Sequence, residues 1–330
     1  MKKDSILKAL FIGVPVAGLL ALPFLGTGET VIYFLLMVMI YAIFAMGFDL
    51  VFGVSGLFSL GHCTFFGAGA YTLAILTARL GLPFWASFIA AGILAALLAM
   101  AFGLISMRLS AIFLSLATLA LAELIHIVMT FKWRSFSGGP DGLGGVPRPS
   151  LWGIDFSQSN NYYLFVTFFF LLAIAVSALI RSSPFGQVLQ GMRQNPIRAQ
   201  QIGFDLKKYK LGVFVISGFF CGIAGGLMAS LTFFTDPSNL NFEMSVSVVI
   251  MTLLGGAGTL LGPVFGVMLY ELMRQVLSTY TSYWMGIIGA VFIIYTIFLP
   301  GGIMGLAEKS WQYIRSGSKG IKNDIGNPEL

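Results

Sequence analysis

The chain has 330 residues, of which 57% are hydrophobic and only 10% are charged. Soluble domains average about 25% charged residues, so this chain has too few ionised side chains to cover the surface of a soluble protein. The mean hydropathy of +0.90 agrees with that shortage. Composition therefore excludes a soluble globule and predicts an all-α, polytopic membrane protein that is embedded in a lipid bilayer.

The net charge of +6 is concentrated rather than spread. Three short segments, 1–8, 181–210 and 308–330, hold thirteen of the nineteen lysines and arginines. Such clusters between apolar runs are typical of cytoplasmic segments of membrane proteins. Few aromatic residues that could stack on bases accompany them, so we do not expect nucleic acid as a partner.

A membrane-spanning helix needs about 20 apolar residues. The basic start and the apolar run 7–25 also suit a signal peptide, but no clear cleavage site follows and further spans come directly after, so we interpret it as the first helix. The predicted spans are 7–26, 30–52, 62–78, 83–106, 112–131, 161–180, 211–234 and 284–306.

The stretch 244–280 is too long for one ordinary span and short for two, and the run 255–258 (GGAG) and the pair Gly262-Pro263 interrupt it. The sequence leaves open whether it crosses twice or is partly re-entrant. Two crossings would give about ten transmembrane helices and place all three basic segments, with both termini, in the cytoplasm. Nine crossings would leave the basic tail outside.

The layout predicts a single transmembrane domain over residues 1–315. Its largest outer loop, 132–160, contains SGGPDGLGGVPRP (137–149), where the density of glycine and proline predicts turns and forbids a helix. A cytoplasmic loop covers 181–210. The polar residues 316–330 are predicted to be a disordered cytoplasmic tail.

Signatures of catalysis are missing from the sequence. It has no phosphate-binding loop, no nucleophile elbow and no cluster of residues with metal-ligand spacing, and His62 and His126 are its only histidines. Cys63 and Cys221 lie in apolar stretches and are predicted to be buried thiols. We therefore expect no enzyme activity, no metal and no cofactor on this chain.

A few ionisable residues fall inside predicted spans, where charge is costly. Glu123 and His126 are three apart and share a helix face, and Glu271 and Arg274 repeat that spacing. Asp49 lies near the inner end of the second span. These groups fit either a polar pathway through the bundle or local ion pairs and snorkelling side chains.

Two glycine-rich stretches, 56–74 and 255–272, look alike. Each begins with glycine, continues through a short turn to Leu-Gly, and enters an apolar helix with many small residues. Paired glycine-broken segments in the two halves of a chain are typical of a translocation path. The predicted path residues are Ser55, Gly56, Ser59, Gly61, Glu123, Gly255, Gly256 and Gly258.

The loop 181–210 has a helical pattern of its own, and long ordered loops tend to be functional. Asn195 can cap a short helix that has Pro196 in its first turn. Ala199 and Gly203 would then lie on one face, small enough to fit a groove of another protein. A merely solvated basic loop is the alternative.

Several segments together resemble a known family, the permeases of ATP-binding-cassette importers for branched-chain amino acids. The likeness is to the longer of two paralogous membrane subunits. The matching segments are 56–72 (GLFSLGHCTFFGAGAYT), 116–124 (LATLALAEL), 137–143 (SGGPDGL), 183–210 (SPFGQVLQGMRQNPIRAQQIGFDLKKYK), 254–266 (LGGAGTLLGPVFG) and 298–306 (FLPGGIMGL).

The resemblance implies partners and roles. It implies a second paralogous permease, two cytoplasmic ATPases that bind the ATP, and an extracytoplasmic solute-binding protein. The glycine-rich stretches 53–61 and 255–262 would line the path. This chain has Asn195-Pro196 where many relatives place an acidic residue. The implied ATPase-coupling residues are Asn195, Pro196, Arg198, Ala199 and Gly203.

The implied fold is similar to that of ten-helix importers, and the implied function is import of branched-chain amino acids across the cell inner membrane, with energy from the partner ATPases. Alternatives are a sister importer for urea, short amides or aromatic acids, an ion-coupled transporter working alone, and a membrane scaffold without transport. Glu123 is the only good candidate for an ion-coupling acid at mid-membrane.

Overall fold

The structure is a computed structural model that describes residues 28–106, 109, 111–151, 154–156, 158–299 and 301–305. The predicted first span 7–26 and the predicted tail 316–330 lie outside the described residues, as do the basic segments 1–8 and 308–330. The remaining predicted spans are all represented.

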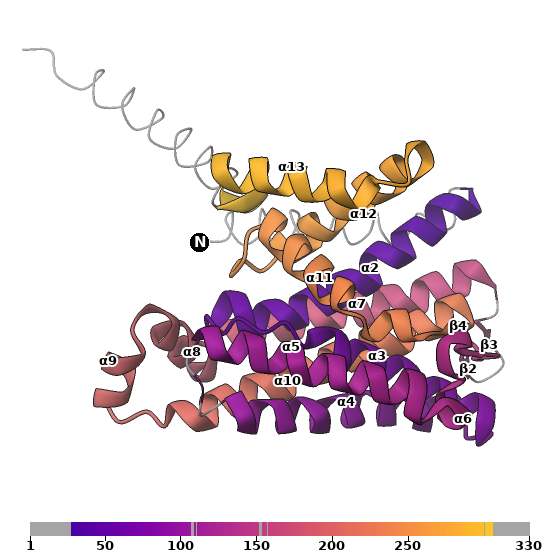
Figure 1. Ribbon diagram of the computed structural model, residues 1–330, viewed down its shortest axis with the longest axis horizontal. Coiled ribbons are helices and arrows are strands. Elements are labelled where there is room, and N and C mark those ends of the chain that lie inside the picture. Colours follow the sequence, from indigo (N-terminus) through magenta and orange to yellow (C-terminus); the bar gives the residue numbers. More distant parts are fainter. Residues whose placement is uncertain are drawn as a thin grey trace, which may run out of the picture.

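Helices dominate the described chain (Figure 1). The long ones are α2 (Glu29–Asp49), α3 (His62–Ala74), α4 (Phe84–Ser106), α5 (Ala111–Ile127), α7 (Ser159–Ser182), α10 (Leu206–Thr232), α11 (Phe242–Gly255), α12 (Gly262–Tyr280) and α13 (Trp284–Phe298). Three of them continue into π-helical turns, η2 (Leu50–Val54), η3 (Ile75–Arg79) and η4 (Val128–Lys132). The short helices are α6 (Arg134–Ser137), η5 (Gly139–Asp141), α8 (Pro184–Gln194), α9 (Pro196–Gln201) and η6 (Pro237–Leu240).

The predicted spans agree closely with these bounds. Within the described residues, six helical segments are long and apolar enough to cross a membrane, which makes the protein a polytopic membrane protein. The ambiguous stretch 244–280 forms two helices, α11 and α12, separated at the predicted glycine-rich break. The 14 residues of α11 extend only about 21 Å, less than the roughly 30 Å of a bilayer core.

The centre of the bundle is built from α2, α3, α4 and α10. Every residue of α3 is buried. A Cβ on Gly69 of α3 would collide with the backbone of Gly222 in α10, so glycine at these two positions lets the helices touch backbone to backbone. On its other side α10 packs against Ala95 and Ala99 of α4. The predicted buried thiols Cys63 and Cys221 are confirmed as free and buried in this core.

The bundle carries different structures at its two ends (Figure 1). Helices α8 and α9 project from one end, called here the α8–α9 end. The strand end has α6 and four short strands, β1 (Leu143–Gly144), β2 (Ser150–Leu151), β3 (Ile154–Asp155) and β4 (Phe234–Thr235). The described chain is predominantly helical, as expected of an all-α protein, and each of these strands has only two residues. Strands β1 and β4 pair antiparallel, which ties the loop 132–160 to the end of α10.

The loop at the strand end follows the predicted turns. Gly138, Gly139, Gly142 and Gly145 all have positive φ, which ends α6 and prevents a longer helix. The guanidinium of Arg148 lies 4.7 Å from the ring centre of Tyr162 and 4.5 Å from that of Phe233. Partial burial lowers the pKa of Arg148 from its ordinary value. The loop is thus an ordered cap, anchored by a cation between two rings.

Two helices remain weakly covered. Helix α13 lies along α11 and α12 at the edge of the bundle (Figure 1), with Ile288 buried and most of its other side chains exposed. Helix α5 is similar, because Ile112, Phe113 and Leu124 are exposed. Apolar surface of this extent faces lipid or another membrane subunit.

Candidate functional site at the junction of the glycine-rich breaks

A buried carboxylate lies where the two glycine-rich breaks meet. Asp49, the last residue of α2, is fully buried, and its Oδ2 forms an ion pair with Arg181 at the end of α7. Its Oδ1 accepts a hydrogen bond from the backbone N–H of Gly258 at 2.8 Å. Arg181 in turn donates to the carbonyl oxygen of Gly258 at 2.8 Å. Asp49 and Arg181 therefore bind the backbone N–H and the carbonyl oxygen of Gly258. We call this arrangement the Asp49 clamp.

The local sequence explains why the clamp can form. Asp49 is followed by the π-helical turn η2, which contains Gly53. A Cβ on Gly53 would overlap both the Asp49 carboxylate and the N–H of Gly258. Gly258 itself has φ +85°, a conformation that side chains disfavour. Glycine at positions 53 and 258 allows the second glycine-rich break to approach the Asp49 carboxylate.

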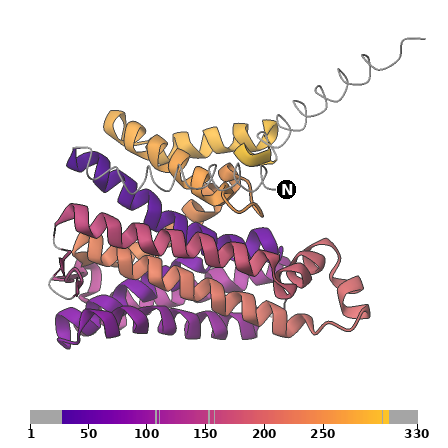
Figure 2. The same ribbon diagram turned by 180° about the vertical axis from the view of Figure 1, so that it is seen from behind.

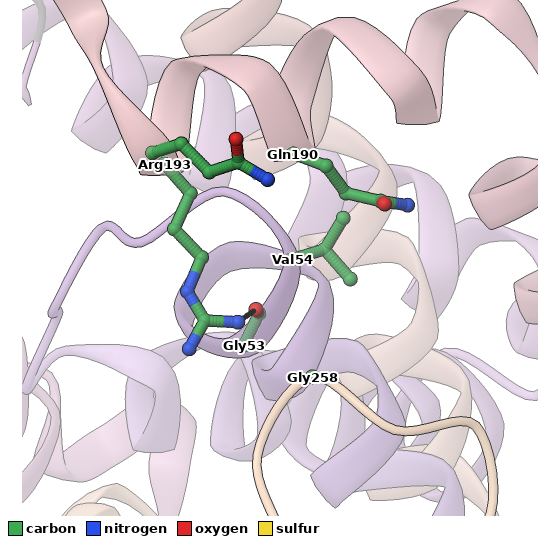
Figure 3. A pocket seen from close by; sticks show the side chains of 6 residues that line it. Gly53, Val54, Gln190, Arg193 and Gly258 are labelled. Atoms are coloured by element: carbon green, nitrogen blue, oxygen red, sulfur yellow. Dashed lines mark hydrogen bonds between the residues drawn. The ribbon is translucent and has the colours of Figure 1, made fainter.

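Arginine 193 links the projecting helix α8 to the same place. Its Nη1 donates to the carbonyl oxygen of Gly53, and Gly56, with φ +74°, lies directly against its side-chain carbons. Figure 3 shows Arg193 and Gln190 reaching from α8 over Gly53, with Gly258 below. A crevice of about 350 Å³ lies between them. Its lining residues are Gly53, Val54, Gln190, Arg193, Gln194 and Gly258.

The charges at the junction do not balance. Arg181 is neutralised by Asp49, whereas Arg193 donates to the carbonyl oxygen of Gly53 and forms no ion pair with any residue that the structure describes. An arginine–carbonyl hydrogen bond is charge-assisted but weaker than a buried ion pair, so Arg193 can release Gly53 more readily than Arg181 can release Asp49. The arrangement can therefore fix both breaks to α7 while coupling them reversibly to α8.

Seven of the eight predicted path residues lie in these two breaks. The two serines among them form hydrogen bonds with the backbone. Ser55 Oγ donates to the carbonyl of Val51 at 2.6 Å, and Ser59 Oγ accepts from the N–H of Gly61 at 3.3 Å. Gly61 has no room for a Cβ beside Phe102. The other path residues in the breaks are glycines that permit turns or close backbone approaches, namely Gly56, Gly255, Gly256 and Gly258.

Glu123 is the predicted path residue that stands apart. It lies in the middle of α5, where its Oε1 is 3.3 Å from His126 Nδ1, and its side chain is about half exposed. The predicted shared face of Glu123 and His126 is confirmed. The second predicted pair is also confirmed, since Arg274 Nε donates to Glu271 Oε2 at 2.9 Å.

The predicted coupling residues occupy α9 and the turn after it. As expected, Asn195 caps α9, its Oδ1 accepting from the N–H of Arg198 at 3.0 Å, and Pro196 is the first helical residue. The expectation that Ala199 and Gly203 share one helix face was wrong. The helix ends at Gln201, and Gly203 follows with φ +99°, its N–H bonded to the carbonyl of Gln200.

Burial also changes which side chains this segment presents. Ala199 is buried, with 7% exposure, so it packs inward instead of facing a partner. Ile197 and Ile202 are 67% and 76% exposed. Two large aliphatic side chains on a polar projection, rather than a small face, are the feature that another protein would contact.

The residues that the sequence did not single out are Arg181, Arg193 and Gly53. The two arginines count toward the basic loop, which hides that they turn back into the bundle. One signal was present, because an acid at position 49 inside a span requires a nearby cation. Metal chemistry has no support here, since the described residues contain no group of three His, Cys, Asp or Glu side chains placed to hold an ion.

Comparison with protein families finds a match to one described as "Branched-chain amino acid transport system / permease component", over residues 30–296. The match spans the bundle from α2 to nearly the end of α13. Both glycine-rich breaks and the α8–α9 segment lie inside it.

Individual relatives agree with that match. The chain is 28% identical to the high-affinity branched-chain amino acid transport system permease protein LivM of Escherichia coli K12, over 86% of this chain and 72% of the relative. It is 23% identical to the corresponding permease protein LivH, over 81% and 92%. The autoinducer 2 import system permease protein LsrC of Klebsiella pneumoniae is 26% identical, over 68% and 66%. No solved structure matches the chain.

Proposed function

The chain belongs to the family of permease components of branched-chain amino acid transport systems, and from this premise we propose that it forms the translocation path of an ATP-binding-cassette importer. Partner ATPases would bind and hydrolyse the ATP, and this chain would hold no cofactor. The substrate class proposed is branched-chain, hydrophobic amino acids. The alternatives of a sister importer for urea, short amides or aromatic acids gain no support from the relatives described above.

One observation carries the mechanical part of the proposal. Helix α8 and the end of α7 contact both glycine-rich breaks, through Arg193 on Gly53 and Arg181 on Asp49 and Gly258. A displacement of the α8–α9 segment by a partner would therefore reach the first break directly and the second break through α7. Rigid-body movement of packed elements is a general way to convert such a displacement into opening or closing of a path.

The basic residues support the membrane orientation that we propose. The α8–α9 end carries Arg198, Lys207 and Lys208 on exposed positions, which supports a cytoplasmic location for this end. With the segment 7–26 as a first span and α11 and α12 as separate crossings, the chain would cross ten times. Both termini would then be cytoplasmic, in an inner or plasma membrane.

A second permease subunit is the partner we expect within the bilayer. LivM and LivH are both named as permease proteins of a branched-chain amino acid transport system, and this chain is similar to each. The weakly covered face of α5 suits that partner. Glu123 and His126 lie there with partial exposure, and such a polar pair is costly against lipid but not against protein or a water-filled path.

The remaining partners would meet the two ends of the bundle. Two ATPases would contact the α8–α9 end, with the exposed Ile197 and Ile202 as anchors. An extracytoplasmic solute-binding protein would deliver the substrate at the strand end, where the loop 132–160 forms an ordered surface. We propose that selectivity resides mainly in that delivering protein.

The first experiment is purification of the chain from its native membranes in mild detergent, with mass-spectrometric identification of what accompanies it. The proposal expects a second permease and two ATPases at stoichiometric levels. Recovery of the chain alone, with or without prior crosslinking, would contradict it and favour an ion-coupled transporter.

A variant pair then tests the docking surface. Ile202→Asp is expected to insert normally but to lose ATPase co-purification and leucine uptake, because a charge would replace an exposed aliphatic anchor. Gln187→Asp adds the same charge at an exposed position of α8 and should retain both. Equal behaviour of the two variants would refute the role of Ile202.

A further inference from the structure

An apolar groove of about 690 Å³ lies on the side of the bundle formed by α4, α7 and α10. Its walls are α4 and α7, and its floor is α10 with Ile43 of α2. Figure 2 shows α10 running between α7 and α4 on this side. The lining side chains are hydrocarbon or aromatic throughout, and Ala96 and Ala173 provide the space between the walls.

Aromatic side chains close the groove toward the strand end. The rings of Phe88 and Phe169 are 5.1 Å apart, and those of Trp85 and Phe165 are 5.6 Å apart. Trp85 Nε1 also donates to the carbonyl of Ser150 at 3.1 Å, which fixes this end of the wall. The space therefore ends here against a packed cluster.

In the other direction the groove continues toward the α8–α9 end. Its lining runs along α7 from Phe169 to Ile180, about 16 Å at 1.5 Å per residue. That length and narrow volume fit an extended hydrocarbon chain, whereas a helix, with a diameter near 10 Å, would need a wider space. A hydrocarbon chain also satisfies a lining that offers no polar group.

Basic residues lie where the groove reaches that end. The groove face of α10 includes Val215, Ile216 and Phe219, and the same helical stripe reaches Lys208 two turns earlier. Lys207 lies beside it, about 100° around the helix, whereas Lys210 lies near the opposite face of α10. Lys208 pairs with Asp205 at 3.6 Å, but both side chains are largely exposed, so this pair is weak.

We propose that the groove binds one acyl chain of an acidic phospholipid, whose phosphate lies against Lys207 and Lys208. The lipid comes from the leaflet on the α8–α9 side, and in this respect the inference rests on the orientation proposed above. Basic clusters next to membrane spans attract acidic headgroups. The bound acyl chain fills the space between α4 and α7. It thereby holds α7, the helix that carries Arg181, against the core.

The acyl-chain part is tested by native mass spectrometry of the full chain with its partners, delipidated and then titrated with phosphatidylglycerol. The wild type should retain one lipid. Ala96→Phe, which fills the groove, should bind it about tenfold more weakly or worse. Ala101→Phe on the exposed side of α4 is the matched control and should bind like the wild type. Equal binding by the two variants, or none by the wild type, would overturn the proposal.

The headgroup part is tested by comparing phosphatidylglycerol with phosphatidylethanolamine. The wild type should prefer the acidic lipid, and the double variant Lys207→Gln, Lys208→Gln should lose that preference while still binding a lipid. Lys132→Gln, at the strand end, should keep it. A wild type without preference would overturn the assignment of the headgroup. Because binding is read without transport, its failure is distinguishable from failure of the proposed importer function.

Discussion

The break at residues 53–61 is held by the neighbouring spans, whereas the long-range polar contacts of the break at residues 255–262 come from the Asp49 clamp. In the first break, the N–H of Leu60 donates to Thr118 Oγ1 of α5 at 3.1 Å, and Gly61 lies against Phe102 of α4. The helix that follows it, α3, is buried along its whole length. Movement of this break would require movement of the core.

The second break has few long-range polar contacts, although the backbone of Gly256 packs closely against that of Gly302. Thr259 Oγ1 donates to the carbonyl of Gly256 at 2.8 Å and accepts from the N–H of Gly262 at 3.1 Å, which are bonds within the break itself. Residues 257–261 are partly or fully exposed, and α12 after them is buried on one side. Its long-range polar contacts run from Gly258 to Asp49 and Arg181.

The difference suggests a division of labour between two stretches that look alike in sequence. The first break is part of a fixed wall, and the second is attached to that wall and to α7 by one clamp. A force applied through α8 and α7 would therefore move the second break first.

Removing the acid of the clamp should have the largest effect. Asp49→Ala leaves Arg181 partly buried without its ion-pair partner, and breaking a buried pair in this way costs about 3–5 kcal/mol. We expect a strongly lowered unfolding temperature in detergent and loss of uptake. Thermal unfolding of the purified protein measures the first, and leucine uptake the second.

The double variant Asp49→Leu, Arg181→Leu separates structure from coupling. Replacing both members of a buried pair by apolar residues is often neutral in stability. We expect most of the unfolding temperature to return while uptake stays low, because Gly258 is no longer attached to α7. Recovery of uptake together with stability would show that the clamp is only structural.

The hairpin of α11 and α12 depends on glycine at a close approach. A Cβ on Gly266 would overlap the carbonyl oxygen of Met251, so Gly266→Val should cost about 1–3 kcal/mol by overpacking. Gly289→Val on α13 is the control, because a Cβ added at that position would meet no neighbouring atom within 4 Å. Similar unfolding temperatures for the two variants would contradict the close packing of the second break.

Two threonines test the breaks directly. Thr118→Val leaves the N–H of Leu60 without its partner at a buried site and should cost about 1–3 kcal/mol, yet the surviving protein should still transport. Thr259→Val should cost about 1 kcal/mol or less, because its site is only half buried, but should lower uptake more. Uptake per folded molecule is the measurement, and the reverse order of effects would overturn the division proposed here.

The spans were predictable because hydropathy and length act locally. The bounds of α4, predicted as 83–106 and found as Phe84–Ser106, depend on little else. The Asn195 cap was predictable for the same reason, since a capping side chain reaches only its own first turn. The break inside 244–280 was visible because glycine and proline end helices wherever they occur together.

The clamp and the strands were not predictable, because each joins segments far apart in the chain. Arg181 carries no mark in the sequence that separates it from Arg198, which is exposed. The pairing of β1 with β4 likewise needs the loop and the end of α10 to meet in space. The error at Gly203 has a local cause, since a glycine near a helix end was assigned to the helix face and not to the terminating position.

That terminating position gives the sharpest test of α9. The N–H of Phe204 bonds to the carbonyl of Ala199, and that of Gly203 to Gln200, with Gly203 at φ +99°. Any other L-residue should cost about 1–2 kcal/mol there, so Gly203→Ala and Gly203→Trp should be destabilised alike. A Cβ added at position 203 would have no neighbouring heavy atom within 4 Å, so the two variants differ mainly in the bulk that they present to a partner. We expect Gly203→Ala to retain uptake and Gly203→Trp to lose both uptake and ATPase co-purification. If both variants transport equally, the turn after α9 does not meet the ATPase, and the displacement that reaches the second break must enter through α8 alone.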